Sequence, residues 1–235
     1  MNPNASVHIL DDDATIPQTV RSALYPTTIQ CKAYRTFADF EQQEINNAAG
    51  CLILDLQLNG ERTSPLIKTL MGRPDFLMTI IVLTGQGTVP AVVEYMRLGA
   101  FDFLEKSIGP HLLLKTMEDA LSFSTSRMAH KTERTRAEKL LASLTIRERQ
   151  IASLVCDGHS SREIADRLDI SVNTVANHRA SALAKLEAQS RADLLRILQL
   201  TRGQFKADRL ARPMIPARSG EGRMEHIEAV SIPSI

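Results

Sequence analysis

Four short apolar segments of this chain each end on polar residues of the kind that phosphoryl chemistry uses. The segments have the length and composition of buried β-strands. The residues at their ends are Asp11, Asp12 and Asp13 after 7–10, Asp55 after 51–54, Thr84 after 80–83 and Lys106 after 101–105. Because the carboxyl ends of parallel strands meet at one edge of an open sheet, we expect these carboxylates, the hydroxyl and the ammonium to share a pocket.

Carboxylates gathered in this way predict a magnesium site, since Mg²⁺ prefers oxygen ligands and keeps several waters. Asp12 and Asp55 are each expected to supply one oxygen, and Asp11 to hold a water ligand. The main-chain carbonyl of Gln57, two residues after Asp55, is expected to add a further protein oxygen.

The same residues predict a reaction at phosphorus. The cation lowers the repulsion between the carboxylates, which keeps Asp55 ionised and able to attack phosphorus. Lys106 and the Thr84 hydroxyl are expected to stabilise the oxygens of the transferred phosphoryl group.

The elements that must position these residues alternate between strand and helix. Amphipathic stretches separate the apolar runs, which predicts an α/β fold with a five-stranded parallel sheet covered on both faces. The five runs lie near residues 7–10, 29–34, 51–54, 79–83 and 100–104.

From residue 144 onward the pattern is purely helical, which predicts an all-α domain of four helices. Thr145 with Glu148 and Ser160 with Glu163 have the spacing of capping boxes. Ser171 and Ser190 are expected to cap a third and a fourth helix.

The chain of 235 residues therefore divides into an α/β domain over 1–122, a partly helical linker over 123–142 and a helical domain over 143–202. Residues 203–235 mix Pro, Gly, Ser and charge without a period, and we expect them to be disordered.

Composition narrows the class of protein. Residues 1–125 hold 9 Lys and Arg against 14 Asp and Glu (net −5), whereas residues 143–200 hold 8 against 7 (net +1), which favours nucleic-acid contact in the second part. No run of eighteen apolar residues or signal-like N-terminus is present. The three cysteines lack metal-binding spacing, and we expect a reduced, cytoplasmic protein without a membrane segment.

The first 122 residues resemble the receiver domain of two-component response regulators, which has a flavodoxin-like fold. The matching segments are Ile9 to Asp13, Leu52 to Asp55, Val82 to Gly85 and Asp102 to Lys106. The resemblance implies that Asp55 accepts a phosphoryl group from a sensor histidine kinase. It also implies that Thr84 reorients towards the phosphate, that Phe103 swings with it, and that the face of the fourth helix and fifth strand then favours dimerisation.

The sequence departs from receiver domains at two positions. Leu58-Asn59-Gly60 follows the acceptor where receivers usually have Met-Pro, and Ser107 follows the lysine where they usually have proline. We therefore expect an altered loop beside Asp55.

A different chemistry is also compatible with the first strand end. Asp11-x-Asp13 resembles the first motif of haloacid-dehalogenase-type phosphatases, in which Asp11 acts as nucleophile and Asp13 as general acid. That interpretation is less favoured, since no later acidic pair follows Lys106 in this domain and Asp55 has no role in it.

Residues 144–200 resemble the LuxR-type helix-turn-helix, and with a receiver domain this gives the NarL/FixJ family. The matching segments are Leu144 to Arg149, Gly158 to Ala165, Leu168 to Ser171, Thr174 to Arg179 and Lys185-Leu186. The alternative for this module is a four-helix protein-interaction domain, because a helix-turn-helix fold does not by itself establish DNA binding.

The expected recognition helix covers residues 172–186. Its outer face carries Asn173, Ala176, Asn177 and Ala180, where Asn177 can read adenine and the alanines can contact a thymine methyl group. Phosphate contacts are expected from Arg162, Thr174, Arg179 and Lys185, while His178 either contacts DNA or packs within the domain.

The sequence thus predicts a transcription regulator and not an enzyme. Its expected partners are a sensor histidine kinase, promoter duplex DNA and a second copy of the chain, with RNA polymerase as a possible further partner. The alternative is a regulator that is dimeric without phosphorylation.

Overall fold

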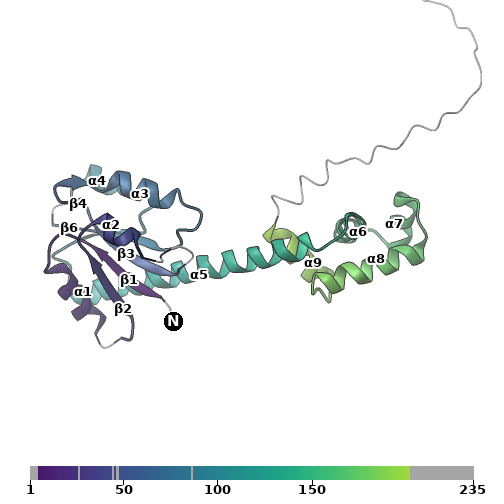
Figure 1. Ribbon diagram of the computed structural model, residues 1–235, viewed down its shortest axis with the longest axis horizontal. Helices are drawn as coiled ribbons and strands as arrows, with labels where there is room; N and C mark the ends of the chain where they lie inside the picture. The colour runs from purple at the N-terminus through teal and green to yellow at the C-terminus, as the bar shows by residue number, and fades with distance from the viewer. Residues whose placement is uncertain (1–4, 26, 44, 46–47, 86, 202–235) are drawn as a thin grey trace, which may run out of the picture.

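The computed structural model describes residues 5–25, 27–43, 45, 48–85 and 87–201. It has an α/β domain followed by a helical domain, and one long helix runs from the first into the second (Figure 1). The predicted disorder of residues 203–235 lies outside the described residues.

A five-stranded parallel sheet forms the centre of the first domain. Its strands are β1 (Ser6–Leu10), β2 (Gln30–Tyr34), β3 (Gly50–Asp55), β6 (Thr79–Thr84) and β7 (Asp102–Glu105). Their order in the sheet is β2-β1-β3-β6-β7, and all four pairings are parallel. The chain moves outward in opposite directions from β1, and ligands of such sheets bind at the carboxyl ends of the strands beside this point.

Helices cover both faces of the sheet, as predicted. Alternate residues of each strand point to opposite faces, so Ile9 and Ile53 pack under α1 (Ile16–Leu24) and the first half of α5 (Pro110–Ala142). Leu52 and Leu54 lie in the other core, together with residues of the three remaining helices. These are α2 (Phe37–Glu41), α3 (Ser64–Met71) and α4 (Val89–Arg97).

The segment that follows β3 is a small antiparallel hairpin that the sequence analysis did not predict. Its strands are β4 (Gln57–Leu58) and β5 (Glu61–Arg62). The turn residues Asn59 and Gly60 have φ angles of 51° and 83°. Positive φ at both central residues is what an Asn-Gly hairpin turn requires, so this dipeptide determines the local structure.

The second domain consists of four helices, as predicted. They are α6 (Ile146–Cys156), α7 (Ser161–Leu168), α8 (Val172–Lys185) and α9 (Arg191–Leu200). The capping boxes at Thr145 and Ser160 are both formed, and the side chains of Ser171 and Ser190 accept hydrogen bonds at the starts of α8 and α9. Ile151, Ile164 and Val175 are fully buried in its core.

The segment 123–142, for which the sequence predicts a partly helical linker, lies within α5, which is one uninterrupted helix of 33 residues. Both ends of the segment are fixed by packing. Ser124 is buried against the α/β domain and accepts a hydrogen bond from the Gly50 amide, whereas Ala137 and Leu141 belong to the core of the helical domain.

Tertiary contacts therefore hold the polar middle of α5 in a helix that its sequence would form only weakly by itself. An ion pair of 2.8 Å between Arg134 and Glu138, one turn apart, adds local support. Within the described part of the chain, none of the helices combines the length and apolar character that a membrane span requires.

Candidate functional site

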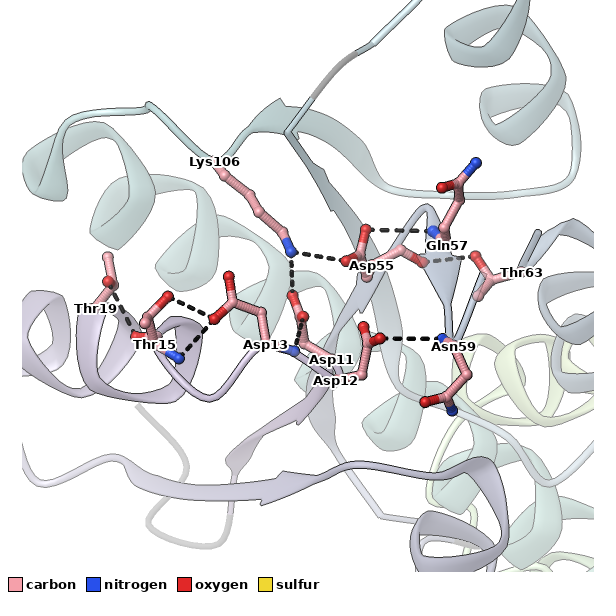
Figure 2. Close-up of polar contacts among 10 residues, drawn as sticks. All are labelled: Asp11, Asp12, Asp13, Thr15, Thr19, Asp55, Gln57, Asn59, Thr63 and Lys106. Atoms are coloured by element: carbon pink, nitrogen blue, oxygen red, sulfur yellow. Dashed lines mark hydrogen bonds and ion pairs between the residues drawn. The ribbon is translucent and has the colours of Figure 1, made fainter. Parts of the chain in front are cut away.

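Three carboxylates meet at the carboxyl edge of the sheet, as the strand ends predicted. Asp11 and Asp12 follow β1, and Asp55 is the last residue of the neighbouring strand β3. One carboxylate oxygen from each of the three lies within 4.8 Å of the other two. Figure 2 shows these side chains converging from two separate strand ends.

Lys106, just beyond β7, joins this cluster from the far edge of the sheet. Its Nζ lies 2.8 Å from Asp11 Oδ2 and 2.7 Å from Asp55 Oδ2 (Figure 2). Its main-chain amide donates to the Thr84 carbonyl at 2.7 Å, so the pairing of β6 with β7 fixes the position of the Lys106 backbone. The ammonium bridges two carboxylates that are 44 residues apart in the sequence.

Burial and charge act on these groups in different ways. Burial raises the pKa of Asp11 and outweighs the attraction of the Lys106 ammonium, which lowers it. For Lys106 burial lowers the pKa, but the bonds and charges of Asp11 and Asp55 together raise it above its ordinary value. Lys106 is therefore held as a cation, while the buried Asp11 carboxylate is poorly compensated.

The acidic cluster has the properties of a cation site. The three carboxylates and one ammonium carry a formal net charge of −2. Asp11 Oδ2 is buried, and its 2.8 Å contact with Lys106 Nζ is an ion pair that lacks the geometry of a hydrogen bond. A buried carboxylate oxygen of this kind is costly unless a cation or hydrogen-bond donor satisfies it. The donor set is all oxygen, which suits a hard divalent cation.

The hairpin contributes main-chain donors to the same cluster. The Asn59 amide donates to Asp12 Oδ2 at 3.3 Å, and the Gln57 amide donates to Asp55 Oδ1 at 3.3 Å. The structure thus places Gln57 beside Asp55. The sequence predicted an altered loop at Leu58-Asn59-Gly60, but it did not predict these hairpin contacts.

Asp13 turns away from the cluster and stabilises the approach to α1. Its carboxylate accepts hydrogen bonds from both the amide and the hydroxyl of Thr15, and these bonds lower the pKa of Asp13. The side chain is thus engaged in local structure.

Thr84 and Phe103 lie next to one another beside the cluster. Thr84 is buried at the end of β6, one residue past the Leu83 that pairs with Asp55. The Phe103 ring packs edge-on against Tyr95 of α4, with ring centroids 6.2 Å apart. A Cβ added at Gly87 would lie 2.9 Å from the Phe103 ring and 3.5 Å from Thr84, so glycine is what gives this ring its space.

The second candidate surface is the outer face of α8. Asn173, Ala176, Asn177 and Arg179 are exposed, and Arg162 of α7 is exposed as well. Thr174 and His178 are half-buried, and the Thr174 hydroxyl lies 2.8 Å from that of Ser171. Val172, in the first turn of α8, is an exposed apolar residue that the sequence analysis did not single out.

Lys185 is engaged inside the helical domain. Its Nζ lies 2.8 Å from Glu148 Oε2, and the other Glu148 oxygen accepts a hydrogen bond from Ser181 at 2.6 Å. The lysine and serine hydrogen bonds, with the Thr145 amide, lower the pKa of Glu148 to about 2. This cluster fixes the end of α8 against the start of α6.

The Glu148 cluster makes the stability of the helical domain dependent on pH. The pKa of Glu148 is lowered on folding from 4.5 to about 2, so its contribution is complete above pH 4.5 and is lost as pH falls towards 2. We expect Glu148→Gln to lower the urea midpoint of unfolding at neutral pH and to converge with the wild-type chain on acidification. Lys185→Met removes the main cause of the lowered pKa of Glu148, so the unfolding midpoint of this variant is expected to change less on acidification than that of the wild-type chain. A difference between wild type and Glu148→Gln that does not vary with pH would contradict this.

Comparison with known families identifies both domains. Residues 7–118 match the response regulator receiver domain, and residues 142–198 match the luxR family of bacterial regulatory proteins. The fold and the acidic cluster therefore belong to a two-component response regulator that carries a LuxR-type DNA-binding domain.

Relatives share this organisation along nearly their whole length. The tetrathionate response regulatory protein TtrR of Salmonella typhimurium is 34% identical over 197 residues, which cover 82% of this chain and 91% of TtrR. The transcriptional regulatory protein FixJ of Azorhizobium caulinodans is 31% identical, covering 85% of this chain and 94% of FixJ. The structure of the response regulator StyR is 28% identical, has a TM-score of 0.74 and covers 83% of this chain and 98% of its own.

The chain belongs to the NarL/FixJ family of two-component response regulators. This confirms the predicted family, fold class and general function. The phosphatase interpretation built on Asp11 and Asp13 is not supported, since the family that matches this domain is the receiver.

Proposed function

We propose that a sensor histidine kinase phosphorylates this chain on Asp55. The observation that carries the proposal is the position of Asp55 at the end of β3, 2.7 Å from Lys106 and among the carboxylates of Asp11 and Asp12. An Asp55 oxygen forms a bond to phosphorus as the bond from phosphorus to the kinase imidazole nitrogen breaks. The products are an acyl phosphate and the free imidazole, and the Lys106 ammonium balances charge on the phosphoryl oxygens.

Mg²⁺ is the cation that we assign to the acidic cluster, because the donor set is all oxygen and the formal charge is −2. Asp12, Asp55 and the Gln57 main-chain carbonyl would hold it directly, and Asp11 would hold it through water. When bound, it neutralises negative charge on the phosphoryl group during transfer. The hairpin amide of Asn59 keeps the Asp12 carboxylate directed into the site.

The response to phosphorylation begins at Thr84 and Phe103. The Thr84 hydroxyl moves to donate to a phosphoryl oxygen, and the Phe103 ring follows into the space that Thr84 leaves. The face formed by α4 and β7 then becomes the dimer interface. Val89, Val93 and Met96 of α4 supply exposed apolar surface for it.

The dimer binds promoter DNA through α8 of each subunit. The base edges are faced by Asn173, Ala176 and Asn177. Other residues contact phosphates and so fix the orientation of the domain on the duplex. We assign phosphate contact to Arg162, Thr174, His178, Arg179 and Lys185. Lys185 is expected to contribute less than the arginines, because its ammonium also binds Glu148.

The DNA contacts predict a dependence of affinity on salt. The logarithm of the binding constant falls with the logarithm of salt concentration by about 0.9 for each phosphate contact. We expect Arg162→Gln and Arg179→Gln each to reduce this slope by about one per subunit. The measurement is fluorescence anisotropy of the full chain on duplex DNA over a range of salt concentrations.

Arg134→Gln is the matched control, since Arg134 is an exposed arginine on α5 that pairs with Glu138. We expect it to leave the slope unchanged. Binding to duplex DNA with no salt dependence, or equal slopes for all three variants and the wild type, would favour a protein-interaction role for the helical domain.

A further inference from the structure

Two buried hydroxyl groups connect the acceptor end of β3 to α4. The Thr63 hydroxyl donates to the main-chain carbonyl of Asp55 at 2.7 Å, and the Tyr95 hydroxyl donates to the carbonyl of Leu56 at 3.1 Å. The two hydroxyl oxygens are 3.3 Å apart. Tyr95 is fully buried and Thr63 is 4% exposed, so both hydroxyls are removed from water.

Tyr95 also contacts the aromatic residue proposed to move with Thr84. Its ring meets Phe103 edge-on at an interplanar angle of 76°. Tyr95 lies in α4 between Val93 and Met96, which are both exposed on the proposed dimer face. One side chain thus touches the acceptor loop, the Phe103 ring and the helix that carries the interface.

The hydroxyl groups are not needed to fill space or to complete a helix. A phenylalanine ring and a valine would occupy nearly the same volume, and burying a hydroxyl is costly unless it is hydrogen-bonded. Thr63 precedes α3 but makes no side-chain capping bond to it. Both hydroxyls instead bind carbonyl groups of the acceptor residue and of the residue after it.

A second contact runs parallel to this buried pair at the surface. Arg62 of the hairpin lies 3.4 Å from Glu94 of α4, with both side chains well exposed. An exposed ion pair contributes little, so the buried hydroxyl pair carries most of the connection between the loop and α4.

We propose that Thr63 and Tyr95 are positioning residues that couple Asp55 to α4, so that a change at Asp55 shifts the dimer face. This inference rests on the proposed function and adds the route by which phosphorylation reaches the interface. Neither residue touches the phosphoryl group. Movement of the Asp55 and Leu56 carbonyls pulls on the two hydroxyls, and Tyr95 moves α4 and the Phe103 ring together.

The test compares dimerisation of the full chain with and without beryllofluoride and Mg²⁺, by sedimentation. The coupling is the ratio of the two dimerisation constants. We expect Tyr95→Phe and Thr63→Val each to lower this ratio by about fivefold to tenfold, the effect of losing one buried hydrogen bond. Fluorine NMR of the bound fluorides checks that Asp55 is still occupied in both variants.

Tyr34→Phe is the matched control, because it deletes a tyrosine hydroxyl of the same domain that bonds only to His8 at 3.0 Å among the described contacts. We expect it to keep the wild-type ratio. Wild-type coupling in both Tyr95→Phe and Thr63→Val would overturn the inference, as would an equal loss in Tyr34→Phe, which would indicate a general effect on stability.

The outcomes separate this inference from the proposed function. A wild-type chain that binds beryllofluoride without a change in dimerisation would overturn phosphorylation-dependent dimerisation, and this inference with it. A wild-type chain that responds, together with unaltered coupling in the two variants, would overturn the role of Thr63 and Tyr95 and leave phosphorylation at Asp55 intact.

Discussion

Asp55→Asn is expected to abolish stable phosphoryl uptake and the dimerisation that follows it. The amide nitrogen and oxygen of Asn cannot form the acyl phosphate, and Asp11 and Asp12 do not reach the same position at the end of β3. The substitution is nearly isosteric, so the sheet edge is expected to remain folded. Intact mass spectrometry after incubation with acetyl phosphate and Mg²⁺ measures uptake, and sedimentation measures dimerisation.

Asp39→Asn is a suitable control, because Asp39 is an acidic residue of α2 that bonds only Thr36 among the described contacts. We expect this variant to take up phosphoryl groups as the wild type does. Uptake that persists in Asp55→Asn and disappears in Asp11→Asn would show that the acceptor has been assigned to the wrong carboxylate.

Lys106→Met is expected to slow phosphoryl uptake by about a hundredfold. Removing one group that stabilises developing charge costs two to three orders of magnitude in rate. The substitution also leaves Asp11 and Asp55 without the ammonium that lies within 2.8 Å of each. The rate of phosphoprotein formation from acetyl phosphate, followed on phosphate-affinity gels, gives the measurement.

Lys115→Met, an exposed lysine of α5, controls for the loss of a positive charge and is expected to react at the wild-type rate. The Lys106 variant is expected to retain its acceptor residue, so prolonged incubation restores phosphorylation. A wild-type rate in Lys106→Met would mean that the ammonium serves only to hold the resting site together.

The grouping of the residues at the strand ends was predictable because all strands of a parallel sheet bring their carboxyl ends to the same edge. Asp11, Asp55 and Lys106 each follow a short apolar run, and the register of the strands places them together without any further information. The capping boxes at Thr145 and Ser160 were predictable for a different reason, since they depend only on residues three apart in the sequence.

Features that depend on side chains from distant segments could not be predicted in this way. Tyr95 in an amphipathic helix reads as an ordinary core residue, and Thr63 as a loop residue. Only the folded chain shows that their hydroxyls meet at the carbonyls of Asp55 and Leu56. The ion pair between Lys185 and Glu148 likewise joins side chains from two helices and could not be predicted from the sequence.

The helical continuity of α5 was missed because local sequence and tertiary packing disagree. Residues 130–136 are polar and lack an apolar stripe, which by itself favours a loosely structured linker. Packing at Ser124 on one side and at Ala137 on the other fixes both ends of the segment, and helix is the regular structure that joins them.

The central claim is that the state of Asp55 controls assembly, and the oligomeric state of the full chain tests it most directly. Sedimentation velocity is measured with Mg²⁺ alone and then with Mg²⁺ and beryllofluoride, which occupies the acceptor as a phosphoryl group does. The account predicts a shift from monomer to dimer when beryllofluoride is added, and no shift in Asp55→Asn. A chain that is equally dimeric in both conditions would contradict it and favour a regulator that works without phosphorylation.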